Sequence, residues 1–284
     1  MPFDSGRWYL GWLGELRALP VPEPDLTTTE KRFGGVHESL NGARVVDVTG
    51  FRTEYRFSFT YLSEPEYEWL RALYLRHIRG PHYLIGPLRK NLLSPQCSTG
   101  YVHGIQDYGW QALGLSYDYV QDFPPTAGIP GNRTFRVLTS VASGALILDG
   151  GKKFVPVLPG EAVTFSAYLR ADAPTTLTMS LDQIDRSGNV VAGGATRSVN
   201  VPTTWTRFLL KHTPTVDAAA VRPVFSFPAA QTYNTAFAAP QVEYGALATS
   251  ADLGGGSTKV LLDQITSTSP QFPYSDVTVT LLEA

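Results

Sequence analysis

Three carboxylates in the strand-rich middle of the chain are the first candidates for chemistry. Asp182, Asp185 and Glu243 lie close to predicted strands, and a glycoside hydrolase needs two carboxylates facing each other across a cleft. Spacing along the chain does not bring any two of them into one cleft, and no catalytic motif accompanies them. We therefore expect a protein that is not an enzyme and name no catalytic residue. A polysaccharide hydrolase or lyase is kept as the second alternative.

The sequence contains no motif for metal binding or redox chemistry either. The five histidines are His37, His77, His82, His103 and His212. None has a Cys, Asp or Glu at metal-ligand spacing, and the single cysteine, Cys97, permits no internal disulfide. His77 lies on the apolar stripe of a predicted helix, which favours a packed or hydrogen-bonded ring. We expect no metal site and no cofactor.

Alternation in three predicted strands gives a binding hypothesis. In TFSAYLRAD, LTMSLD and AVRPVFSF one parity is apolar and the other is largely polar, as in the strands of a sandwich. The outward parity contains Tyr168, Arg170, Asp182 and Arg222. An aromatic ring can stack on the CH face of a sugar while charged groups take its hydroxyls, so these four residues are candidate glycan contacts. An ordinary solvated sheet face is the open alternative.

The composition describes a folded, turn-rich protein. Of 284 residues, 43% are hydrophobic and 17% charged, with 26 Gly and 21 Pro. The formal net charge of −2 gives no electrostatic footprint for nucleic acid. No apolar run approaches the roughly 18 residues of a membrane span, and the N-terminus does not resemble a signal peptide. We expect no nucleic-acid recognition, no membrane insertion and synthesis in a cytoplasm.

The best-determined element group is a strand, a capped helix and a second strand over residues 51–87. Aromatic side chains alternate with polar ones over residues 55–61, which predicts a half-buried strand. Ser63 and Glu66 have the spacing of a capping box, and apolar residues then recur at helical spacing up to Ile78. Gly80 and Pro81 predict the end of the helix, and residues 82–85 predict the second strand.

The N-terminal region contains aromatic residues and turn signals. Residues 7–13 read as a strand, and Asn41-Gly42 is typical of a hairpin turn. A domain of about 120 residues would not bury all of its large apolar side chains alone. We therefore expect four of them at an oligomer interface: Trp8, Tyr9, Leu10 and Trp12.

Residues 96–252 predict only strands and turns, spaced as in a β-sandwich. The glycine-rich residues 253–258 predict a flexible linker. Beyond them, the alternation over residues 276–282 predicts a strand that pairs with the strand at 54–62. The chain is therefore expected to be mainly β, with a small discontinuous β domain carrying one α-helix (1–93 and 257–284) and an inserted jelly-roll sandwich with its linker (94–256).

The sandwich segments resemble a known family. GEAVTFSAYLRA from Gly160, TWTRF from Thr204 and APQVEYG from Ala239 resemble the jelly-roll carbohydrate-binding modules of glycosidases and phage tail proteins. The resemblance implies a jelly-roll fold. The sugar contacts of such modules follow no fixed motif.

The outer segments resemble a second family. GGVHESLNGAR, EYRFSFTYLSEPEYEWLRAL and GPHYLIGPLRKNLLSP, closed by DVTVTLLEA, resemble the distal-tail or minor tail proteins of long-tailed, siphovirus-like actinobacterial phages. In that family a β domain with one helix forms a ring at the tail end, and a sandwich interrupts it after an Asn-Leu-Leu run, here Asn91-Leu92-Leu93.

Together these resemblances imply a structural protein of the virion tail tip or baseplate. Its expected partners are copies of itself in a ring, taken as a hexamer, the tail tube and tail hub proteins, and host cell-wall polysaccharide contacted through the sandwich during host adhesion. A stand-alone, lectin-like glycan-binding protein is the first alternative.

Overall fold

The protein is mainly β, as its sequence predicts. The computed structural model describes residues 4–33, 35–38, 44–46, 50–80, 82–99, 109–120, 122, 124, 134–149 and 154–284. The chain divides into two compact units: unit 1 is Met1–Gly6, Leu13–Leu16 and Ile85–Ser257, and unit 2 is Arg7–Trp12, Arg17–Leu84 and Thr258–Ala284. Among the described residues, no helix combines the length and apolarity needed to cross a membrane.

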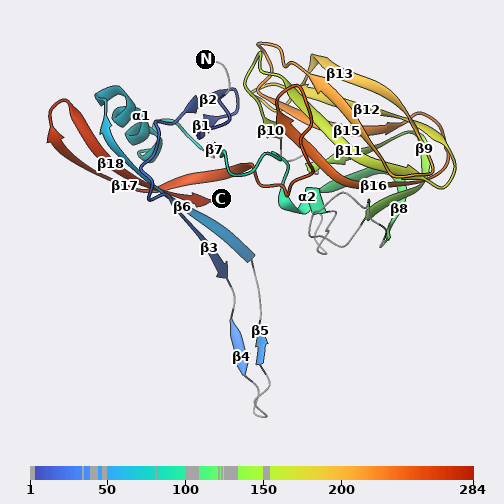
Figure 1. The fold of residues 1–284 in the computed structure, drawn as a ribbon, viewed down its shortest axis with the longest axis horizontal. Coiled ribbons are helices and arrows are strands. Elements are labelled where there is room, and N and C mark those ends of the chain that lie inside the picture. The colour runs from blue at the N-terminus through green and yellow to red at the C-terminus, as the bar shows by residue number, and fades with distance from the viewer. Residues whose placement is uncertain are drawn as a thin grey trace. The chain divides into compact units, whose positions relative to one another are not determined.

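Most residues of a seven-stranded sheet of order β2-β1-β7-β17-β18-β6-β3 belong to unit 2; the first half of β2 and one end residue each of β7 and β17 are assigned to unit 1. The strands of this sheet are β1 (Tyr9–Trp12), β2 (Glu15–Ala18), β3 (Thr27–Phe33), β6 (Gly50–Leu62), β7 (His82–Ile85), β17 (Ser257–Gln271) and β18 (Tyr274–Glu283). Strand β18 runs antiparallel to β6, with Val279 opposite Phe57 (Figure 1). This confirms the predicted return of the C-terminal strand to the strand at 54–62.

Helix α1 (Glu64–Tyr74) packs on this sheet through Leu70 and Leu73, which are buried with Phe57 and Phe59 of β6. The Glu66 carboxylate accepts hydrogen bonds from the amide (3.0 Å) and the hydroxyl (2.7 Å) of Ser63, in the predicted capping box. The helix ends earlier than expected, because Arg76 takes a left-handed φ of 59°. In consequence His77 lies beyond the helix and is exposed. Of the two expected roles, a packed or a hydrogen-bonded ring, the packed one is therefore wrong.

Most of the aromatic N-terminal segment is buried in the folded protein. Trp8 and Leu10 lie in the core of unit 2, where the Trp8 ring meets that of Phe57 edge to face at 5.1 Å. Tyr9 is also buried, and only Trp12, 39% exposed, offers surface. The reasoning that placed these four residues at an oligomer interface was therefore wrong for three of them, because β1 is an internal strand of the sheet.

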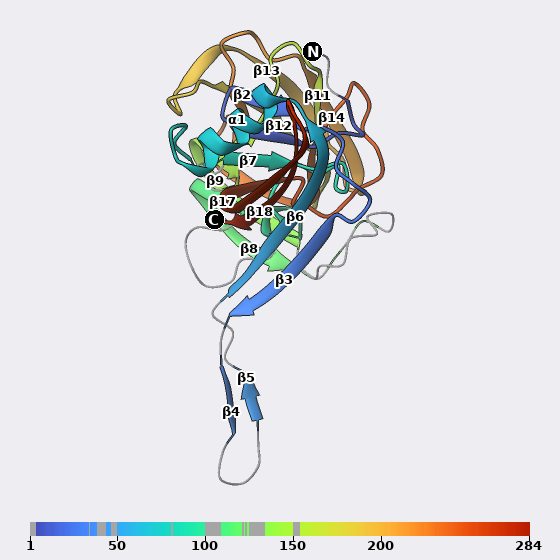
Figure 2. The same cartoon turned by 90° about the vertical axis from the view of Figure 1, so that its left-hand side faces the viewer.

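Strands β3 and β6 extend the sheet of unit 2 into a long hairpin (Figures 1 and 2). All seven residues of β3 are exposed. Farther along lie the paired strands β4 (Val36–Glu38) and β5 (Arg44–Val46), which confirm the predicted hairpin. The Asn41-Gly42 turn itself is outside the described residues.

Unit 1 is a jelly-roll β-sandwich of two antiparallel layers (Figure 1). Its strands are β8 (Trp110–Val120), β9 (Thr134–Leu148), β10 (Val155–Pro156), β11 (Val163–Ala171), β12 (Thr175–Ile184), β13 (Val190–Val201), β14 (Thr206–His212), β15 (Ala220–Phe227) and β16 (Gln231–Tyr244). We call β14-β11-β16 with the first half of β9 the β11 layer. We call β13-β12-β15 with the second half of β9 the β12 layer.

Strand β9 serves both layers because it bends. Its first half pairs with β16 and its second half with β15. Between them Ser143 has a φ of 63°, and facing it on β8 Gly114 has a φ of 62°. Phe165 from β11 and Phe225 from β15 meet between the layers at 5.3 Å, so the apolar parity predicted for these strands forms the core.

The segments on either side of the sandwich are packed into it. Asn91 is buried; its side-chain amide donates to the carbonyls of Pro240 and Asp252 (both 3.0 Å), and its oxygen accepts from the Val242 amide (3.2 Å). A Cβ on Gly254 would stand 2.3 Å from the Ser94 carbonyl oxygen. The glycine run is therefore a site of close backbone approach rather than the flexible linker its composition suggested.

Unit 1 also contains a short helix that the sequence did not predict. Helix α2 (Pro95–Thr99) lies in a stretch expected to hold only strands and turns. Proline at the first helical position costs no hydrogen bond, because that amide has no intrahelical partner. Cys97, within α2, is buried.

Candidate functional site

The four residues proposed from parity lie on two different faces. Tyr168 and Arg170 of β11 point away from the core on the β11 layer, whereas Asp182 of β12 and Arg222 of β15 point outward on the β12 layer. The inward residues of the two layers meet in the core, so the two outer faces are opposite surfaces of the sandwich. The structure thus brings these residues together as two pairs and not as one site.

On the β11 layer, Arg170 is the centre of a polar and aromatic cluster. Its guanidinium pairs with Asp122 at 2.5 Å and lies over the indole of Trp205, 5.6 Å from the ring centroid. On the neighbouring strand β14, the Arg207 guanidinium lies 5.5 Å from the Tyr168 ring centroid. Both aromatic rings are half-buried, so each has one part fixed by an arginine and another part open to solvent.

A row of side chains continues from Arg170 across the same face. Strand pairing aligns Arg170 with Ala236, Ala236 with Arg136, and Arg136 with Asp118. Arg136 donates to both carboxylate oxygens of Asp118, at 2.9 and 2.5 Å. Ala236, between the two arginines, has only a methyl group. The two arginine–aspartate pairs therefore lie on either side of a shallow strip of surface over β16. We call this surface, made by Asp118, Asp122, Arg136, Tyr168, Arg170 and Trp205, the β11 face.

The charges of the β11 face hold one another ionised. The Arg136 guanidinium donates hydrogen bonds to Asp118 and thereby holds the pKa of that carboxyl below its ordinary value. In return Asp118, with a smaller contribution from Asp172, raises the pKa of Arg136. The pair stays charged at neutral pH, and it therefore presents fixed donors and acceptors at the surface.

The rest of the β11 layer is covered by the loop that follows β16. Glu243 is buried, and its carboxylate accepts hydrogen bonds from the Thr249 amide (2.9 Å) and hydroxyl (2.7 Å). Arg207 donates to the Thr249 carbonyl and to the Ser166 hydroxyl. The loop therefore closes one half of the layer and leaves the β11 face as its open half.

The carboxylates considered for hydrolysis are engaged separately. Glu243 holds the loop, and Asp182 accepts a hydrogen bond from Arg222 at 2.7 Å. Asp185 accepts from the amides of Ser187 and Asn189, both at 2.8 Å, and so closes the turn between β12 and β13. The structure does not bring any two of these three residues into one site.

Within the described part of the chain, no three His, Cys, Asp or Glu side chains lie close enough together to hold a metal ion. His82 and His212 are buried, and burial lowers the pKa of each. His103 lies outside the described residues.

Sequence reasoning missed most of the β11 face. Trp205 lies half-buried beside Arg170, although the outward parity of the predicted strands does not include it. Asp118 and Asp122 gave no signal, because their contacts join strands and loops far apart in the sequence. A polar residue at the outward parity of β9, Arg136, was the one local hint.

Comparison with known proteins gives fold similarities at low identity. No family model matches the chain, and no curated protein sequence does. A solved domain of tailspike protein 4 from bacteriophage CBA120 matches with a TM-score of 0.44 and 14% identity, over 55% of this chain and 21% of that one. This chain thus spans about a fifth of the tailspike chain.

Two carbohydrate-binding modules are also similar. The CBM22-1 xylan-binding domain of Paenibacillus barcinonensis Xyn10C matches with a TM-score of 0.40 and 17% identity, over 56% of this chain and 97% of that domain. TmCBM61, solved with β-1,4-galactotriose, matches with a TM-score of 0.39 and 11% identity, over 55% of this chain and 99% of that one.

Proposed function

We propose that the chain is a structural virion protein of a phage tail tip whose jelly-roll sandwich binds host cell-surface carbohydrate through the β11 face. The observation that carries the binding role is the Arg170 cluster, in which Trp205, Tyr168 and two arginine–aspartate pairs share one open surface. Asp182 and Arg222, on the opposite face, are not part of this proposal.

The chemistry of the face suits a sugar. A pyranose presents an apolar CH face, which stacks on an aromatic ring, and a rim of hydroxyls, each of which both donates and accepts hydrogen bonds. Tyr168 and Trp205 supply the rings, Asp118 and Asp122 supply acceptors, and the arginines supply donors. Since the arginine–aspartate pairs already fix these groups, little side-chain freedom is lost when a ligand binds.

The face is shallow, so one site should bind weakly, with a dissociation constant on the order of millimolar. A ring of copies would engage one cell surface through several sites at once. Such linkage raises the apparent affinity by roughly 10²-fold or more without any new contact. Weak single sites are therefore compatible with firm attachment of a whole tail.

Support for the tail-tip role comes from unit 2. Its outer segments carry the sequence resemblance to ring-forming tail proteins. The C-terminal strand β18 pairs with β6, so these segments form one sheet. Strand β3 pairs only with β6 among the described residues, and its whole length is exposed. An exposed edge strand is a surface on which another chain can pair, so β3 replaces the N-terminal aromatic residues as the candidate contact between copies.

Two experiments test the two halves of the proposal. A carbohydrate microarray carrying bacterial wall polysaccharides should retain the full-length protein, and Trp205→Ala should reduce the signal while Val216→Ala, an exposed control, should not. Antibody labelling of intact virions should place the protein at the tail tip. Binding on the array without labelling of tails would favour the stand-alone, lectin-like alternative.

A further inference from the structure

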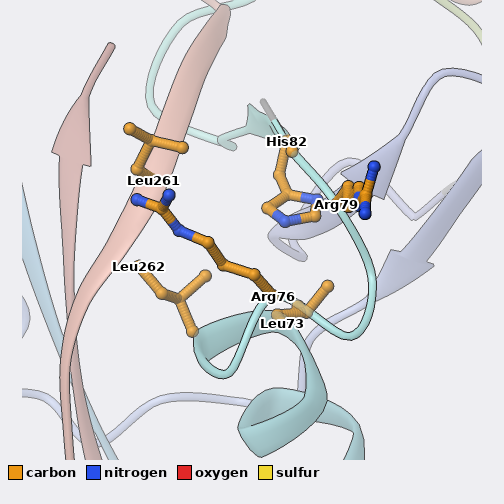
Figure 3. Close-up of a pocket in the computed structure, with 7 residues that line it drawn as sticks. Leu73, Arg76, Arg79, His82, Leu261 and Leu262 are labelled. Carbon is orange, nitrogen blue, oxygen red and sulfur yellow. The ribbon is translucent and has the colours of Figure 1, made fainter.

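Unit 2 contains a hollow at the end of α1 that the proposed function does not use. It has a volume of about 490 Å³ and is lined by Leu73, Arg76, Arg79, Gly80, His82, Leu261 and Leu262. Figure 3 shows Arg76 extending from the end of the helix toward Leu261 of β17, with the His82 ring and Arg79 across from it. The volume is within the range of small-molecule sites.

The hollow has a positive lining. Arg76 and Arg79 are both exposed, and neither has an ion pair within the part of the chain that the structure describes. Other cations of unit 2, such as Lys31 and Arg71, each pair with a glutamate. No Asp or Glu is among the lining residues. The two guanidinium groups therefore have hydrogen-bond donors available for a ligand.

His82 adds a polar group that lacks a partner. The residue is 2% exposed, and its Nδ1 atom is buried with no hydrogen-bond partner among the described residues. A buried polar atom without a partner is unfavourable, so a shift of the ring that let Nδ1 meet a ligand would be favoured. Leu73, Leu261 and Leu262 give the hollow an apolar wall beside these polar groups.

We propose that this hollow binds an oxyanion, a phosphate or a carboxylate, carried on a small organic ligand whose apolar part lies against the three leucines. Arginine suits both anions, because its planar group donates two parallel hydrogen bonds to two oxygens of either. His82 lines the hollow beside the two arginines. This inference is independent of the β11 face, which lies in unit 1.

The test uses three probes with the full-length protein: inorganic phosphate, butyl phosphate and hexanoate. Titration calorimetry should detect butyl phosphate binding more tightly than inorganic phosphate, because only the former contacts the leucines. Comparable binding of hexanoate would show that the hollow accepts either oxyanion, and much weaker binding of hexanoate would assign it to phosphates. Absence of heat with all three would overturn the proposal.

Matched variants locate the binding. Arg76→Gln with Arg79→Gln should weaken butyl phosphate binding by at least about tenfold, the effect of losing charge-assisted hydrogen bonds. Arg32→Gln with Arg71→Gln removes the same charge from unit 2 outside the hollow and should leave the affinity unchanged. In NMR spectra the His82 ring signals should shift on addition of butyl phosphate. Equal losses in both double variants, or unshifted His82 signals, would contradict the assignment.

Discussion

Arg170 of β11 lies over the indole of Trp205, with its guanidinium carbon 5.6 Å from the ring centroid, while the same guanidinium pairs with Asp122. One side chain thus orders an aromatic ring and a carboxylate at the same surface. The ring offers stacking and the carboxylate offers acceptors, which are the two interactions that a sugar requires. We therefore expect Arg170 to position the β11 face as well as to contact the ligand.

The first prediction concerns the helix of unit 2. Leu73→Ala should lower the free energy of unfolding by roughly 2–5 kcal/mol, because the side chain is buried in the core. Glu66→Ala should cost only about 1 kcal/mol, since it removes hydrogen bonds at the helix start. Urea unfolding of both variants provides the comparison. Equal costs would contradict the described burial of Leu73.

The second prediction concerns the limits of the sandwich. A fragment spanning residues 86–257 should unfold at a higher temperature than one spanning residues 96–252. The longer fragment keeps Asn91, Leu92 and Leu93, all buried, and the glycines that pack on them. Circular dichroism melting of the two fragments decides between them, and equal melting temperatures would mean that these segments do not stabilise the sandwich.

The sequence predicted the parity of strands but not the face to which each strand contributes. Alternation identified Phe165, Phe225 and their inward neighbours correctly, because burial follows a period of two. Alternation cannot distinguish the two outer faces of a sandwich, which is why Tyr168 and Asp182 were assigned to one surface. Their separation depends on pairing between strands distant in the sequence.

Long-range packing also explains the errors at the ends of the chain. Trp8 and Leu10 become core residues because β1 lies inside a sheet completed by β17 and β18. A residue count for the domain does not show how many large side chains such a sheet and its helix can bury. The glycines at 254–256 were interpreted as a linker because composition does not reveal the backbone that they approach.

The third prediction is a loss of stability at mildly acidic pH. Burial lowers the pKa of His82 and of His212, so below the ordinary histidine pKa the unfolded chain binds more protons than the folded one. Stability should therefore fall as the pH decreases from about 7.5 to about 5.5. Urea midpoints at the two values measure the slope.

Variants test the cause of that slope. His82→Asn and His212→Asn should each flatten the pH dependence, whereas His77→Asn should not, because His77 is exposed. A slope that persists unchanged in the variant combining His82→Asn and His212→Asn would assign it to other groups.

The fourth prediction concerns contacts between copies through β3. Phe33 at the end of β3 is 47% exposed, and Phe33→Asp should place a charge in any strand-to-strand contact made there. Mass photometry of the wild type should give a multiple of the 31.0 kDa chain, and the variant should shift toward one chain. Val216→Asp, an exposed position in unit 1, is the control. Intact oligomers of Phe33→Asp would exclude β3 as the contact.

The central claim, that the β11 face binds carbohydrate, is tested most directly by comparing the two outer faces of the sandwich in one binding assay. Cell-wall polysaccharide from a panel of actinobacteria is titrated into the full-length wild type, Arg170→Ala and Arg222→Ala, and affinity is measured by calorimetry. Both substitutions remove one partly buried arginine from an ion pair with aspartate. We predict that Arg170→Ala loses about tenfold or more in affinity, whereas Arg222→Ala binds as the wild type does. Equal affinity of Arg170→Ala and wild type, or a loss confined to Arg222→Ala, would contradict the claim.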